Sequence, residues 1–168
     1  MNANEQALSI ARRAFQLARG GDAAGLAALL DAGMPVDARN ETGDSLLMLA
    51  AYHGHLEAAE LLLRRGADPE LRNDRGQTPL AGAAFKGNEA MVALLLDRGA
   101  EVDGLTADGR TPLTFAAMFD HLSVVELLLA RGASPHGQAT GVRPLEASRT
   151  MGARRTESLL DAVLSHPV

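Results

Sequence analysis

The sequence predicts an all-α repeat solenoid, and three regularities in it carry that prediction. Glycines recur every 33 residues, at Gly33, Gly66, Gly99 and Gly132. Each of them ends an apolar run rich in leucine, such as Leu61–Leu63. A second glycine series keeps the same step and precedes a helix-start pattern; its members are Gly43, Gly76 and Gly109, with Gly141 following after 32 residues. Self-similarity at a fixed period of about 20–50 residues is typical of stacked repeats.

Length and composition fit one soluble domain. The chain has 168 residues, of which 46% are hydrophobic and 22% are charged, an ordinary globular composition. It contains no cysteine, which excludes disulfides, thiolate zinc sites and cysteine nucleophiles. The formal net charge of −5 argues against nucleic acid as a main partner.

Localisation is predicted from what the sequence lacks. No apolar stretch approaches the roughly 20 residues that a membrane span needs, and the N-terminus shows no secretory pattern. Lys86 is the only lysine among 16 basic residues, and this bias toward arginine suggests a GC-rich genome. We therefore expect a bacterial, cytoplasmic protein.

The first helix of each unit is predicted to begin just after the second glycine. Thr78 and Thr111 are N-caps whose hydroxyls accept from orphan backbone N–H groups, and a proline follows each at the first helical position. An earlier unit has Ser45 at the cap, whereas the last unit keeps Pro144 but has Arg143 before it. These helices end in alanine pairs that allow close approach of another helix: Ala50-Ala51, Ala83-Ala84 and Ala116-Ala117.

The second helix is predicted to begin at Leu56, Ala90 or Leu122 and to end at the glycine after the leucines. That glycine stands where a left-handed residue is wanted after a helix. An extended loop of about ten residues then leads to the next unit. Such a unit cannot bury its apolar face alone, so the units must stack.

The 33-residue period and the Thr-Pro-Leu start at Thr78–Leu80 and Thr111–Leu113 resemble the ankyrin repeat. The resemblance covers nearly the whole chain and implies a single ankyrin-repeat domain over residues 1–168. It implies full repeats at 41–73, 74–106 and 107–139, with capping repeats at 5–40 and 140–168. Both caps are more polar than the inner repeats: Arg12 takes the position of Ser45, and Arg154–Glu157 take the positions of Leu122–Val125.

The chain departs from the family at one position of every repeat. The signature histidine is replaced by Met48, Ala81, Thr114 and Glu146. The resemblance implies that this histidine ties neighbouring loops together, so its loss bears on the rigidity of the stack.

The next position along is implied to face the inter-helix core. It is occupied by Leu49, Gly82, Phe115 and Ala147. Phe115 has a large side chain and Gly82, in the adjacent repeat, has none. This suggests that the large side chain in one repeat compensates for the missing volume in the other.

The two positions after each alanine pair are implied to lie on the concave face, and we call them the concave ridge. They are Tyr52, His53, Phe85, Lys86, Met118 and Phe119, with Thr150 and Met151 in the C-terminal cap. Three of the five aromatic residues fall here, and exposed apolar patches usually mark a contact. The alternative is that these side chains only pack over neighbouring helix ends.

The predicted loop tips add a mixed-charge rim to this ridge. Its candidate binding residues are Arg39, Arg72, Arg75, Leu105 and Arg110, interspersed with Asp74 and Asp108. Polar rims of this kind surround apolar hot spots, although a solvated face has the same composition.

Other chemistry finds little support in the sequence. His53 and His55 form a pair that lacks an evident third metal ligand. The glycines follow the repeat and not a phosphate-binding spacing, and no nucleophile, base and oxyanion donors converge. We expect no metal, no cofactor and no enzymatic activity.

The sequence therefore predicts a non-catalytic module, monomeric in isolation, that binds a folded protein partner through the concave ridge and loop tips. Within that class it leaves open an adaptor and an inhibitor or immunity protein that covers a partner enzyme. A small-ligand-binding accessory protein and a homodimer that buries the ridge are the rival hypotheses.

Replacing Phe115 by alanine should lower the free energy of unfolding by roughly 3–5 kcal/mol, because a large aromatic side chain leaves the core. Urea denaturation measures this loss, and an unchanged midpoint would contradict it.

Overall fold

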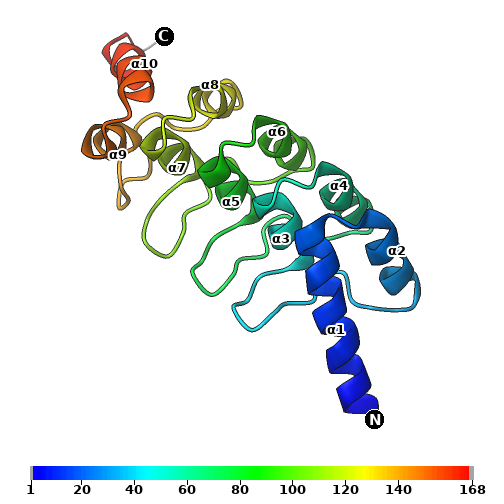
Figure 1. The fold of residues 1–168 in the computed structure, drawn as a ribbon. Coiled ribbons are helices and arrows are strands. Elements are labelled where there is room, and N and C mark those ends of the chain that lie inside the picture. Colours follow the sequence, from blue (N-terminus) through cyan, green and yellow to red (C-terminus); the bar gives the residue numbers. More distant parts are fainter. Residues whose placement is uncertain (1, 167–168) are drawn as a thin grey trace.

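The computed structural model describes residues 2–166, which form ten α-helices arranged in five successive pairs (Figure 1). The helices are α1 (Ala3–Gly20), α2 (Ala23–Asp31), α3 (Leu46–Tyr52), α4 (Leu56–Arg64), α5 (Pro79–Lys86), α6 (Glu89–Asp97), α7 (Pro112–Met118), α8 (Leu122–Ala130), α9 (Pro144–Met151) and α10 (Arg154–Ser165). Odd-numbered helices pack against one another in an inner row and even-numbered helices in an outer row. The predicted all-α repeat solenoid is confirmed.

Local capping signals start the helices where the sequence predicts. The side chains of Ser45, Thr78 and Thr111 each accept from the backbone N–H three residues later, whereas α9 begins after Arg143 without a side-chain cap. The outer helix α6 begins at Glu89, one residue before the predicted start, because the Asn88 side chain accepts from a backbone N–H in its first turn.

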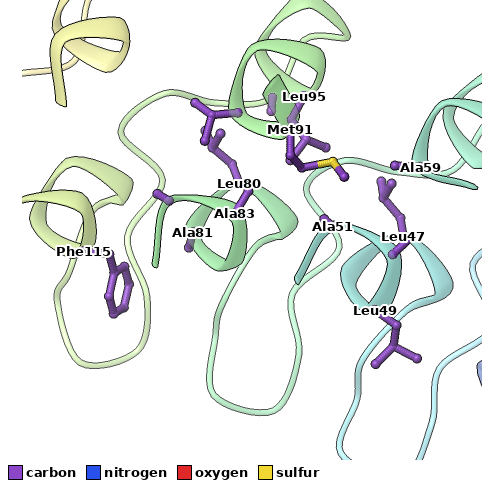
Figure 2. Packing of buried hydrophobic residues seen from close by; sticks show 14 of the residues in the cluster. Leu47, Leu49, Ala51, Ala59, Leu80, Ala81, Ala83, Met91, Leu95 and Phe115 are labelled. Carbon is purple, nitrogen blue, oxygen red and sulfur yellow. The ribbon is translucent and has the colours of Figure 1, made fainter. Parts of the chain in front are cut away.

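The core lies between the two rows. Leu47 and Leu80 point from the inner row toward the outer helices, where they are fully buried (Figure 2). All six residues of the predicted alanine pairs also have no exposed surface, so neighbouring inner helices pack directly against one another. Leu49 and Phe115 are buried too, at 5% and 7% exposure. Figure 2 shows both pointing away from the outer helices, toward the side of the long loops.

The loops are tied together although the signature histidine is missing. One backbone hydrogen bond joins each loop to the next: Asp74 N–H to Thr42 O at 3.1 Å, Ala107 N–H to Arg75 O at 3.3 Å and Val142 N–H to Gly109 O at 2.9 Å. Thr114, at one of the histidine positions, donates its hydroxyl to Val142 O at 3.1 Å. A shorter side chain in the first turn of α7 thus joins this helix to the following loop.

Two histidines join the turns between helices of successive repeats. His55 Nε2 lies 2.7 Å from Arg19 O, and His121 Nε2 lies 2.9 Å from Phe85 O. The ring of His121 lies against Gly87, where a Cβ would come within 2.5 Å of the ring Nδ1. Glycine is therefore required at position 87 both for this approach and for its φ of 71°.

Helix α1 is longer than any inner helix of the repeats, a feature that the sequence analysis does not predict. Asn2 and Glu5 form a capping box that starts it, and its first turns extend past the loops (Figure 1). Leu8 and Ile10 on this extension are 52% and 41% exposed. Within residues 2–166, no helix is both long and apolar enough to cross a membrane.

Substituting Gly87 by alanine should destabilise the protein more than substituting Gly99, because only Gly87 faces a neighbouring ring. Both residues have positive φ, but no atom lies within 4 Å of a Cβ built on Gly99. We expect Gly99→Ala to cost about 1–2 kcal/mol from backbone strain and Gly87→Ala about 1–3 kcal/mol more. Urea denaturation of both variants measures the difference.

A double-mutant cycle with His121→Ala separates the cost of the contact with the His121 ring from the cost of backbone strain at position 87. The extra cost of Gly87→Ala should shrink when the ring is absent. Equal destabilisation by the two glycine substitutions would show that the ring moves aside freely.

Candidate functional site

The concave ridge carries a continuous row of aromatic rings across three repeats. Tyr52 ends α3, Phe85 lies at the end of α5, and Phe119 directly follows α7. The Tyr52 and Phe85 rings stack with centroids 6.1 Å apart, and the Phe85 and Phe119 rings meet edge-on at 4.8 Å. Phe85 also contacts the buried Phe115 edge-on at 6.1 Å, which anchors the row to the interior.

The two ends of the row remain accessible. Tyr52 is 37% exposed and Phe119 is 39% exposed, whereas Phe85 between them is half-buried. His53 and Lys86 are exposed beside Tyr52, with the His53 ring edge-on at 5.3 Å and the Lys86 Nζ 5.1 Å from the Tyr52 ring centroid. Five of the six predicted ridge residues are thus connected by ring or cation–π contacts. Met118, the sixth, is half-buried at the end of α7.

Two of the predicted loop arginines hold the loops together. Arg39 donates to Gly43 O at 3.0 Å and to Arg72 O at 2.5 Å, and it lies 3.8 Å from an oxygen of Asp74. Arg72 repeats the pattern one unit later, donating to Gly76 O at 3.1 Å and to Leu105 O. Their guanidinium groups are therefore engaged in bonds between successive loops, a structural role that the sequence analysis does not assign.

The other three loop residues differ in their surroundings. Arg75 is exposed, and its guanidinium forms no ion pair within residues 2–166. Leu105 is half-buried, and Arg110 is half-buried in an ion pair with Asp108. Of these three, Arg75 has the side chain most open to a ligand.

A hollow of about 410 Å³ lies between the long loops and the ends of α3 and α5. Met48, Leu49 and Phe85 provide apolar surface to it, and Gly82 lines it without a side chain. The polar lining includes Arg19 and Arg75, together with His53, Asp44 and neutral loop residues.

Arg19 is not among the predicted residues of the concave ridge, although the repeat itself identifies it. Counting back 33 residues from Tyr52 gives Arg19, so it occupies the ridge position of the first unit. It lies in the last turn of α1 and lines the hollow with its exposed side chain. Neither Arg19 nor Lys86 forms an ion pair within the part of the chain that the structure describes.

These positive groups act on His53. Desolvation of part of its ring lowers the pKa of His53 below the ordinary value of 6.5, and repulsion from His55, Arg19 and Lys86 lowers it further. The neutral ring is therefore favoured, and the positive charge beside Tyr52 comes from Arg19 and Lys86.

Comparison with known proteins establishes the family of this chain. The family model described as ankyrin repeats (3 copies) matches residues 12–73 and 47–139. The chain belongs to the ankyrin-repeat family. Ankyrin repeats are generally non-catalytic protein–protein interaction modules.

A named relative shares part of this ankyrin array. A Pseudomonas aeruginosa protein whose name describes it as an ankyrin repeat protein is 56% identical over 47 residues. The match covers 28% of this chain and 28% of that protein, so the similarity is confined to a segment of each.

Replacing Lys86 or Arg19 by glutamine should raise the pKa of His53, since each substitution removes a repelling charge. An NMR titration of the histidine rings measures the pKa, with Arg64→Gln on α4 as a control of equal charge change. A His53 pKa that is the same in all variants would contradict this electrostatic account.

The lowered pKa of His53 also determines how the stability of the folded protein depends on pH. Because the pKa of His53 is lower in the folded than in the unfolded chain, protonation favours unfolding. The contribution of His53 to stability should be lost as the pH falls through about 6.5 toward the folded-state pKa.

Proposed function

We propose that this ankyrin-repeat protein is a non-catalytic interaction module that binds a folded protein partner through its concave ridge and loop tips. The observation that carries the proposal is the aromatic row formed by Tyr52, Phe85 and Phe119. Its two ends are 37% and 39% exposed in a protein with only five aromatic residues. Rigid aromatic side chains supply large contact area at little cost in conformational entropy, and they are enriched in interface cores.

The contacts behind the row favour a preorganised surface. Phe85 packs on the buried Phe115, and each adjoining loop is hydrogen-bonded to the next. A binding face whose side chains are already fixed loses little freedom on association.

The loop residues divide into two roles in this proposal. Arg39 and Arg72 support the face by bonding the loops to one another. Arg75, Leu105 and Arg110 form the rim, with Arg75 the side chain best placed to meet a partner. Rim charges of this kind affect association rate and partner choice more than total affinity.

We further propose that residues 5–40, 41–73, 74–106, 107–139 and 140–168 are the units of a single cytoplasmic domain, monomeric in isolation. We also propose that neither nucleic acid nor a membrane is its partner. Met1, Pro167 and Val168 lie outside the described residues. An inhibitor or immunity protein that covers a partner enzyme would use the same face.

A small-ligand-binding accessory protein is the second candidate, and the hollow beside Gly82 is the observation that favours it. Its volume of about 410 Å³ lies within the usual range of ligand pockets. A ligand that binds only the folded state would raise the melting temperature.

Affinity capture from a lysate of the encoding cell, read by mass spectrometry, tests the protein-binding proposal. We expect wild-type protein to retain a partner that a Tyr52→Ser, Phe119→Ser variant loses, because the two exposed ends of the aromatic row are removed.

The control is Ile10→Ser, which removes an apolar side chain of similar exposure, 41%, from the extension of α1. Circular dichroism establishes that all variants fold. Retention of the same partner by the ridge variant would place binding elsewhere on the molecule.

A further inference from the structure

The hollow between α3 and α5 is lined in part by Gly82, which has no side chain. At the same position of the other units stand Gln16, Leu49, Phe115 and Ala147. Leu49, Phe115 and Ala147 are buried, at 5%, 7% and 6% exposure, and Gln16 is exposed. Gly82 is thus the member of this series without a side chain, and it lies directly beside the exposed Tyr52.

Neither the backbone nor the packing requires glycine at position 82. Gly82 lies inside α5 and is absent from the glycines with positive φ. A Cβ there would lie 3.4 Å from Met48 Sδ and 3.6 Å from Tyr52 Cδ2, so an alanine would fit. Glycine in a helix interior is destabilising relative to alanine. Gly82 is buried, and the room that its missing side chain leaves lies next to Met48 and Tyr52 at the edge of the hollow.

The polar groups around the hollow are mainly positive. Arg19 and Arg75 line it without an ion pair among residues 2–166, and Lys86 lies over the adjoining Tyr52 ring. Asp44 is the acidic residue in the lining, and its carboxylate already accepts from Asn73 Nδ2 at 2.9 Å and Thr42 Oγ1 at 2.7 Å. A ligand therefore meets an apolar floor bordered by available cations, in a chain whose net charge is −5.

We propose that this hollow receives one apolar side chain from an exposed, acidic segment of a protein partner. The apolar side chain enters beside Gly82 and packs against the edges of Tyr52 and Phe85, and carboxylates flanking it in the partner meet Arg19, Arg75 and Lys86. This inference rests on the proposed protein-binding function and adds to it the chemistry of the partner. Apolar burial supplies affinity at the hollow, and charge complementarity selects the segment.

Selection from a displayed library of random 12-residue peptides tests the proposal. Wild-type protein should enrich sequences in which one large apolar residue is flanked by aspartate or glutamate. A synthetic peptide of the enriched sequence is then titrated by fluorescence polarisation, and its affinity should fall as salt is raised, because the cations are exposed.

Variants separate the hollow from the charges. Gly82→Leu should weaken binding of the peptide at least tenfold by filling the space, and Gly82→Ala should weaken it less. Because alanine fits at this position, Gly82→Ala keeps the test valid if the leucine variant does not fold. Arg75→Glu should also weaken binding at least tenfold, whereas Arg64→Glu on α4 makes the same charge change away from the hollow and should leave affinity unchanged.

Three outcomes would overturn the inference. They are enrichment of peptides without an acidic bias, binding that survives Gly82→Leu in a folded protein, and no enrichment at all. The capture experiment with the ridge variant judges the proposed function separately. A partner lost by the Tyr52→Ser, Phe119→Ser variant but retained by Gly82→Leu would leave the concave ridge as the binding face and refute the role of the hollow.

Discussion

The close approach of neighbouring inner helices is the constraint on which the rest of the structure depends. Helices of seven to nine residues, such as α3 and α4, are marginal in isolation. They persist here because alanine pairs such as Ala83 and Ala84, with no exposed surface, let the next inner helix pack directly against them. The same periodic packing brings the ends of α3, α5 and α7 into register, and the aromatic row follows from that register.

In the loops, polar groups also connect each unit to the next one along the chain. Asp37 accepts from the backbone N–H of Asp68, and Glu70 accepts from that of Glu101, in each case 31 residues further along. Arg39 continues the pattern with a bond to the carbonyl of Arg72. These side-chain contacts add to the backbone hydrogen bonds that join consecutive loops. The loss of the signature histidine is therefore compatible with an ordered stack.

The sequence predicts this fold well because its signals are local and periodic. A threonine cap such as Thr78 acts within one turn, and the glycine step sets the repeat. The site is predicted less completely, because the partners of long side chains depend on the neighbouring unit. Nothing local to Arg39 or Arg72 indicates that their guanidinium groups bond to the next loop. Arg19 is different, since the 33-residue step identifies it once α1 is recognised as the first inner helix.

In the described part of the chain, three cations beside the hollow take no part in the ion pairs of this acidic protein. On the outer row, several arginines pair with carboxylates of the preceding unit, as in Arg65 with Asp31 at 2.6 Å and Arg131 with Asp97 at 2.7 Å. On the inner side, Arg19, Arg75 and Lys86 lack such partners within residues 2–166. Three cations that lack ion pairs among the described residues thus lie together at the hollow of a chain whose net charge is −5. Cations gathered at a cleft attract groups of opposite charge there, because their local field adds to that of the whole protein.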